Sequence, residues 1–196
     1  LEACASAKQR VVFFNELIGS QANMADALFA DFNERLNASM SVSRDGFTPA
    51  IAIHSPYSVH PVLLKKGLQI AKERSLKVSA HFMESQAERE WLDSADGGFQ
   101  EFFNSLLNQT QPTTDAVEFL ENFNDIKTIF THATKINNKE LEIIKTNMHT
   151  IVHCPISNRL LGNGALDIDS LDNASIPWIC ATDGLSSNYK LDLLEE

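Results

Sequence analysis

The chain has 196 residues, 43% of them hydrophobic, which is enough to build one sizeable core in an ordinary globular protein. Its formal net charge of −10 argues against a nucleic-acid backbone or an anionic membrane surface as the partner, because both require a basic face. No apolar run approaches the roughly 20 residues needed to span a bilayer, and no signal peptide is visible, so we expect no membrane association.

Short apolar runs alternate with segments of helical periodicity along the chain. The expected strands cover residues 11–14, 50–53, 78–81, 128–131, 150–152 and 178–182. Helices are expected over about residues 24–36, 62–74, 86–92, 99–106, 117–123 and 138–144. The expected N-terminal caps are Asn23, Thr114 and two capping boxes, Ser85 with Glu88 and Asn137 with Glu140. Because no hairpin signal joins consecutive strands, these units predict a parallel α/β sheet, either doubly wound or closed as a (β/α)8 barrel.

The sequence lacks the glycine-rich motifs that cradle nucleotide phosphates. Neither G-x-G-x-x-G nor G-x-x-x-x-G-K-[ST] follows an expected strand, and Gly162-x-Gly164 lacks the strand-to-helix context. A different signal, an aromatic stripe at helical spacing, consists of Phe99, Phe102, Phe103 and Leu106. Such a stripe is typical of core packing. A lid or a homodimer contact is the alternative.

Polar, chemically capable side chains follow the ends of the expected strands. They are Glu16, His54, His81 with Glu84, His132, His153 and Asp183. One such histidine is more often structural, but a buried polar group needs a partner, so a whole set is hard to explain as packing. In a barrel, the carboxyl ends of all strands meet at one mouth. The pattern therefore favours a shared site.

Imidazoles and carboxylates in one site are typical of metal-assisted hydrolysis. They bind Zn²⁺, or alternatively Fe or Mn, and the metal lowers the pKa of its bound water towards neutrality. Glu84, three residues after His81, is placed to shuttle protons to a leaving group. The zinc site of cytidine deaminases is excluded, because its Cys-x-x-Cys is absent.

The strand-end motifs resemble those of the amidohydrolase superfamily. They are His54-Ser55-Pro56-Tyr57, His81-Phe82-Met83-Glu84, Thr131-His132-Ala133, His153-Cys154-Pro155-Ile156-Ser157-Asn158 and Ala181-Thr182-Asp183-Gly184. Within the superfamily they are most similar to the branch of chlorohydrolases and S-adenosylhomocysteine/5′-methylthioadenosine deaminases. Phe14-Asn15-Glu16-Leu17-Ile18-Gly19 also looks like the aminofutalosine deaminases of the menaquinone pathway.

The resemblance implies a distorted (β/α)8 barrel with one divalent metal ion, and it implies roles for individual residues. His81 would be a metal ligand, and Asp183 both ligand and catalytic base. Glu84 would be the proton shuttle and would also contact a substrate ring nitrogen, and His132 would orient or polarise the attacking water. His54 would contact the substrate. The implied reaction is hydrolytic deamination of an aminopurine nucleoside such as aminofutalosine, 5′-methylthioadenosine or S-adenosylhomocysteine.

Two other functions stay open: a dechlorinase or amide hydrolase on the same barrel, or a catalytically silent barrel used as a binding scaffold. The family's His-x-His pair has no counterpart among the six histidines of the chain. We therefore expect residues 1–196 to be a partial barrel, about strands three to eight, without the N-terminal strands and the flanking β-sandwich. Alone, it is expected to bind metal poorly and to be inactive.

The remaining residues of interest carry weaker expectations. Asn158 either lines the mouth and binds substrate or forms a turn, while His153 either lines the cleft or supports it. Glu16 could touch the substrate, and His60 and His149 are expected in solvated loops. The cysteines, Cys4, Cys154 and Cys180, are few and widely spaced, which indicates reduced thiols in a cytoplasmic protein.

Overall fold

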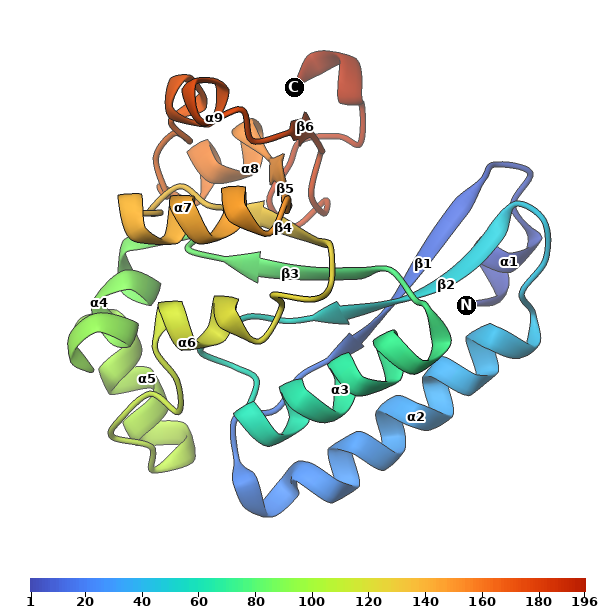
Figure 1. Cartoon of the computed structure of the whole chain (residues 1–196), viewed down its shortest axis with the longest axis horizontal. Helices are drawn as coiled ribbons and strands as arrows, with labels where there is room; N and C mark the ends of the chain where they lie inside the picture. The colour runs from blue at the N-terminus through green and yellow to red at the C-terminus, as the bar shows by residue number, and fades with distance from the viewer.

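A six-stranded parallel sheet with strand order β1-β2-β3-β4-β5-β6 forms the centre of the computed structural model, which describes residues 1–196 (Figure 1). The strands are β1 Val11–Leu17, β2 Phe47–Ile53, β3 Val78–Phe82, β4 Thr128–His132, β5 Thr150–His153 and β6 Trp178–Cys180. Each strand pairs with the next one in sequence. A doubly wound sheet reverses its strand order at a switch point, whereas a barrel wall keeps it. The observed order is therefore that of a barrel wall.

Helices follow the strands as the periodicity predicts, with two additions. The helices at the predicted places are α2 Ala25–Ser41, α3 Pro61–Arg74, α4 Gln86–Ser94, α5 Gly98–Leu107, α6 Ala116–Glu121 and α7 Asn138–Thr146. Two short helices, α8 Pro155–Leu160 and α9 Ile168–Ala174, were not predicted from the sequence. Short elements at the two ends and before α2 are α1 Glu2–Ser6, η1 Ala22–Met24 and η2 Leu193–Glu195. None of the helices is long and apolar enough to cross a membrane.

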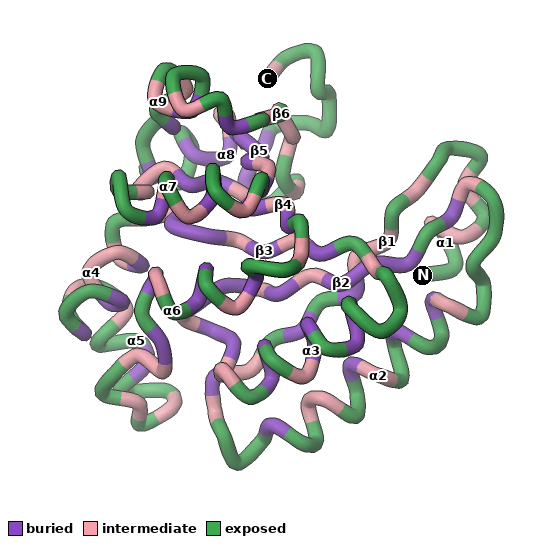
Figure 2. Tube along the Cα trace, in the orientation of Figure 1, coloured by how far each residue is buried: buried purple, intermediate pink, exposed green.

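The hydrophobic core lies between the strands and the helices that cover one face of the sheet. Helices α2 and α3 run side by side along β1 and β2 (Figure 1), and buried residues follow the strands and the helix sides that face them (Figure 2). On β3, Val78, Ala80 and Phe82 belong to this core, while Ser79 and His81 alternate with them and are only half-buried. The other face of the sheet is thereby left for polar strand-end side chains.

The expected caps Asn23 and Thr114 are wrong. The expected box of Ser85 and Glu88 is incomplete, because the Glu88 carboxylate accepts hydrogen bonds from the N–H groups of Met83 and Glu84 and not from that of Ser85. Helix α6 is capped by Asp115, which accepts hydrogen bonds from two backbone N–H groups, whereas the Thr114 hydroxyl donates to a backbone carbonyl. Asn23 lies inside η1, which leads directly into α2. At α7 the expected box of Asn137 and Glu140 is complete.

Two histidines expected in solvated loops have structural roles. His149 is fully buried, and its Nδ1 accepts a hydrogen bond from the Thr128 N–H at 3.2 Å. The expectation was wrong because burial of this position is set by neighbouring strands and by contact with Phe130, neither of which is local in sequence. His60 caps α3 by accepting a hydrogen bond from the Val62 N–H. All three cysteines are free thiols.

Candidate active site

A cavity of about 300 Å³ opens at the carboxyl ends of the strands. Its lining consists of His54, Tyr57, His81, Glu84, His132, Leu161, Asp183, Ser186 and Ser187. These residues come from β3, from the end of β4 and from the segments that follow β2, β3, α8 and β6. Parallel pairing in register aligns the strand ends, which is why residues distant in sequence meet here. The structure thus brings together the five strongest candidates from the sequence.

His81 is held in one orientation by the strand beside it. Its backbone N–H and its ring Nδ1 both bond to the carbonyl oxygen of His54, at 2.9 and 2.8 Å. A carbonyl can only accept, so Nδ1 carries the proton and the lone pair lies on Nε2. This arrangement, with the far nitrogen fixed by a backbone carbonyl, is the one that metal-binding histidines use.

His54 lies beside His81, with ring centroids 5.3 Å apart. Its Nδ1 is 2.6 Å from the Ser58 hydroxyl and 3.0 Å from that of Ser55, and the two hydroxyls are 2.6 Å apart. Burial, and next the proximity of His81, lower the pKa of His54 below its ordinary value. The ring is therefore neutral at pH 7 and can exchange hydrogen bonds with an uncharged ligand.

His132 is the most buried of the three imidazoles. Its ring Nδ1 is 2.9 Å from Asn158 Oδ1, so Nδ1 carries the proton and Nε2 keeps its lone pair. Nε2 lies 3.6 Å from a carboxylate oxygen of Glu84. Burial is the largest influence on the pKa of His132 and lowers it. Its φ of 78° is in the left-handed region, a costly conformation for this residue, which supports a functional constraint at the end of β4.

Asn158 and His153 lie behind the cavity and not in its lining. Asn158 is fully buried, and its amide nitrogen is 3.5 Å from His153 Nδ1 while its oxygen accepts from His132. The structure therefore does not place Asn158 at the mouth, where it could bind substrate. Its position on the helix directly after β5 points it inward at the His132 ring, so it fixes the tautomer of that ring.

Glu84 is anchored on both its side chain and its backbone. One carboxylate oxygen accepts a hydrogen bond from Asn163 Nδ2 at 3.1 Å. Its N–H donates to the carboxylate of Glu88 at 2.8 Å, and its carbonyl accepts from the Thr134 hydroxyl at 2.6 Å. Met83, just before it, has a φ of 51°, which turns the chain sharply after β3. The carboxylate is thus held beside His132.

Asp183 is surrounded by hydrogen-bond donors. One oxygen accepts from the Ser157 hydroxyl at 2.6 Å and the Ser187 hydroxyl at 3.1 Å, and the other accepts from the Gly184 N–H at 2.8 Å. Burial alone raises the pKa of Asp183, but these hydrogen bonds outweigh burial, so the pKa lies below its ordinary value. Asp183 is therefore an anion at neutral pH, suited to binding a cation or accepting a proton.

A model of the amidohydrolase family matches residues 1–196, the whole chain. The chain belongs to the amidohydrolase family. It is 51% identical over 196 residues to aminodeoxyfutalosine deaminase of Nitratiruptor sp., covering 100% of this chain and 48% of that protein. It is 33% identical to adenosine deaminase of Helicobacter pylori, with 94% of this chain and 46% of that protein covered.

A solved structure of the family supports the barrel interpretation. The crystal structure of Helicobacter pylori aminofutalosine deaminase in complex with methylthio-coformycin matches with a TM-score of 0.93 and 30% identity, covering 100% of this chain and 48% of that chain. This amidohydrolase chain spans about half the length of the relatives it matches. The fold is therefore the amidohydrolase barrel, seen over about half of the relatives' length.

The amidohydrolase family is generally metal-dependent, and two side chains of the cavity fit that chemistry. His81 presents an Nε2 lone pair, and Asp183 is ionised. No group of three or more His, Cys, Asp or Glu side chains is placed to hold a metal ion. Catalytic zinc sites use three protein ligands. His81 and Asp183 therefore fit part of a metal site but do not complete one.

Several residues of the site were given no role in it by the sequence, although some of them lie in the quoted motifs or in an expected cap. They are Ser55, Tyr57, Ser58, Glu88, Ser157, Asn163 and Ser187. The glycines on either side of Asn163, both with positive φ, mark a constrained loop that carries this amide to Glu84. For Asn163, the Gly162-x-Gly164 pattern was the one clue in the sequence. Glu16 does not line this cavity, although its negative charge acts to raise the pKa of His54.

Glu88 is a buried carboxylate beneath the segment that carries Glu84. It accepts the N–H groups of Met83 and Glu84 and so replaces the reciprocal bond of a full capping box at Ser85. Burial is the largest influence on the pKa of Glu88, which it raises to about 7. Folding therefore favours the protonated form of Glu88. The unfolding free energy that Glu88 contributes is present at acidic pH and is lost as pH rises from the ordinary carboxyl pKa towards 7.

Glu88→Gln in the full-length protein should flatten the pH dependence of stability. The wild type should lose roughly 3 kcal/mol of unfolding free energy through this group between acidic and neutral pH, and the variant should not. Denaturant titrations at a series of pH values measure the slope. Glu118→Gln, at an exposed position, is the matched control. An equal slope in wild type and Glu88→Gln would contradict the assignment.

Proposed function

We propose that the protein is a metal-dependent aminohydrolase that deaminates an adenine-type nucleoside and releases ammonia. The observation that carries this proposal is the convergence of Glu84, His132 and Asp183 on one cavity, each with its own hydrogen-bond partner. The likeness to aminodeoxyfutalosine deaminase supports the same reaction class. The substrates proposed are aminofutalosine, 5′-methylthioadenosine and S-adenosylhomocysteine.

One divalent metal ion, zinc in the first place, would be held by His81 and Asp183 together with donors outside residues 1–196. When bound, such an ion lowers the pKa of water and so supplies a nucleophile at neutral pH. Fe or Mn would accept the same donors. The fixed His81 tautomer and the ionised Asp183 are what this chain contributes to binding the metal.

The proton transfers are assigned to the carboxylates. Asp183 takes a proton from the attacking water, and His132, through its unprotonated Nε2, accepts a hydrogen bond that orients this water. The water oxygen bonds to the ring carbon that bears the amine. The proton taken by Asp183 passes on to Glu84, which delivers it to the departing nitrogen. The C–N bond breaks with its electron pair on that nitrogen, ammonia leaves, and both carboxylates are again ionised. His54, neutral and fixed by two serines, contacts the rest of the substrate.

The proposal is tested by ammonia release from 5′-methylthioadenosine and adenosine. We expect the full-length protein to release ammonia after loading with zinc, and to stop after chelation of the metal. Loss of activity on chelation and its return on reloading would support metal dependence. No ammonia from any aminopurine nucleoside would overturn the proposal and would favour a dechlorinase, an amide hydrolase or a binding scaffold.

A further inference from the structure

The segments that follow β3 and β4 are bonded to each other beyond the ends of these strands. The backbone N–H of Ala133 donates to the Phe82 carbonyl at 2.9 Å, and that of Lys135 donates to the Met83 carbonyl at 3.0 Å. The contact between neighbouring strands thus continues past their last paired residues. The two segments therefore form one structural unit beside the active-site cavity.

The side chain of Thr134 lies between these two backbone bonds. Its hydroxyl is 2.6 Å from the Glu84 carbonyl oxygen, and the Met83 carbonyl oxygen is farther away, at 3.4 Å. A threonine hydroxyl has one proton to donate, so the hydrogen bond is the shorter contact, to Glu84. Thr134 is half-buried and does not line the active-site cavity. Its contact with the proposed mechanism is therefore the backbone of Glu84.

Glu84 is fixed at its N–H, its carbonyl and its carboxylate, and each of these groups is bonded to a different part of the chain. The N–H donates to Glu88 on α4, and the carboxylate accepts from Asn163 in the loop after α8. The carbonyl accepts from Thr134, two residues after His132. The Thr134 bond thus joins Glu84 to the segment of His132, whose Nε2 lies 3.6 Å from the Glu84 carboxylate. It therefore helps to set the distance between these two side chains.

Both segments pass through costly backbone conformations. The φ angle is 51° at Met83 and 54° at Ala133, in the left-handed region that residues with a Cβ rarely adopt. Such conformations persist only where surrounding contacts enforce them. Helix α4 supplies part of this support, because the Arg89 guanidinium donates to the Lys135 carbonyl at 2.7 and 3.2 Å. The Thr134 hydroxyl supplies support on the side of Glu84.

We propose that Thr134 is a positioning residue that holds the Glu84 carboxylate in place for proton transfer, an inference that rests on the proposed function. In the proposed mechanism Glu84 delivers a proton to the departing nitrogen, and this transfer requires the carboxylate within hydrogen-bond reach of that nitrogen. A displacement of about 1 Å costs up to about 10²-fold in rate. Without the Thr134 hydroxyl, the Glu84 carbonyl loses its donor and the peptide after Glu84 is free to rotate.

The test compares Thr134→Val, which has the same shape without the hydroxyl, with Thr134→Ser, which keeps the hydroxyl. The measured quantity is kcat for ammonia release by the zinc-loaded full-length protein, from 5′-methylthioadenosine or adenosine, whichever the wild type turns over faster. Thr134→Val should lower kcat by about 10-fold or more at unchanged metal content. Thr134→Ser should stay near the wild-type kcat. Thr134→Ala repeats the loss of the hydroxyl with a smaller side chain and should behave like Thr134→Val. Thr146→Val is the matched control, because Thr146 is exposed at the end of α7 and outside the cavity lining.

A second measurement repeats Thr134→Val in the Glu84→Gln background. If Thr134 acts through proton transfer by Glu84, the added substitution should change kcat by less than about 2-fold, because that transfer is already lost. A residue that only stabilises the fold would lower kcat by the same factor in both backgrounds. The comparison therefore separates positioning of Glu84 from general stabilisation.

The outcomes separate the inference from the function on which it rests. If the wild type releases ammonia but Thr134→Val keeps the wild-type kcat, the inference fails and the proposed function stands. The same holds if Thr134→Ser loses as much as Thr134→Val, or if Thr134→Val has an equal effect in the Glu84→Gln background. If Glu84→Gln itself turns over at the wild-type rate, the inference fails together with the role of Glu84. If the wild type deaminates neither substrate, both the function and the inference fail.

Discussion

Asp183→Asn in the full-length protein is expected to abolish deamination, even with metal supplied in excess. Asp183 is ionised because three donors hydrogen-bond to its carboxylate, and an asparagine has neither the negative charge nor the basicity. The variant would lose a metal ligand and the acceptor of the water proton together. Turnover measured as ammonia release, alongside metal content, checks the prediction.

A matched control for this variant is Asp169→Asn. Asp169 is an exposed residue of α9 outside the cavity lining, so its variant should retain wild-type turnover and metal content. Turnover of Asp183→Asn within about 10-fold of the wild type, in protein that contains metal, would remove Asp183 from the roles of ligand and base.

Glu84→Gln is expected to keep the metal content and to lower kcat by about 10²-fold or more, the scale of lost acid/base catalysis. The glutamine has the same shape, and its oxygen can still accept from Asn163, so the segment after β3 should keep its conformation. What it loses is the ability to bind and release a proton. Metal content is measured by elemental analysis, and kcat from initial rates.

Glu101→Gln is the control for this second substitution. Glu101 is exposed on α5 and does not line the cavity. If Glu84→Gln turned over at close to the wild-type rate, Glu84 would have no part in proton transfer, and its contact with Asn163 would be only structural. If metal were lost as well, Glu84 would have to be assigned to metal binding.

The sheet and the strand-end residues could be predicted because their signals are local. An apolar run followed by His or Asp identifies both a strand and its end, and parallel order then brings His81 and His132 together. Local sequence patterns do not show which polar side chains hold Glu84, His132 and Asp183 in place. Asn163 reaches Glu84 across 79 positions of sequence, a contact that no spacing rule describes.

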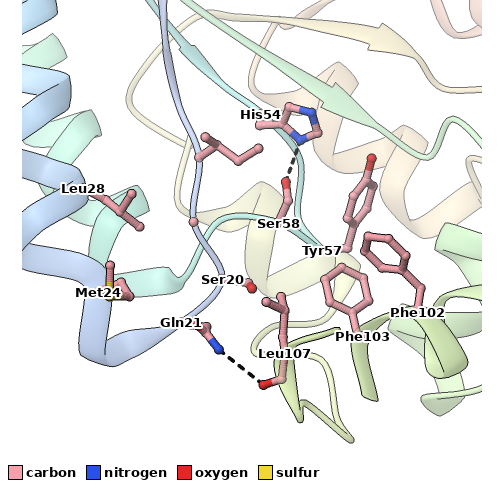
Figure 3. A pocket seen from close by; sticks show the side chains of 12 residues that line it. Ser20, Gln21, Met24, Leu28, His54, Tyr57, Ser58, Phe102, Phe103 and Leu107 are labelled. Carbon is pink, nitrogen blue, oxygen red and sulfur yellow. Dashed lines mark hydrogen bonds between the residues drawn. The ribbon is translucent and has the colours of Figure 1, made fainter. Parts of the chain in front are cut away.

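The burial of polar side chains was also hard to predict where elements distant in sequence cover them. His149 and Asn158 are both polar and both fully buried, and each is paired with a group from another part of the chain. For Asn158, burial changes the chemical interpretation from a substrate contact to a residue that fixes the His132 ring. The cavity between α5 and the segment after β1 (Figure 3) exists because these two elements lie close together, which only the folded chain reveals.

The most direct test of hydrolytic deamination at this site follows the oxygen atom of the attacking water. The zinc-loaded full-length protein would turn over 5′-methylthioadenosine in water enriched in heavy oxygen, and the product would be analysed by mass spectrometry. We expect one solvent oxygen on the ring carbon that carried the amine, ammonia in equal amount, and neither product from Asp183→Asn. An unlabelled product, or cleavage of the bond to the sugar in place of the C–N bond of the amine, would contradict the proposed reaction.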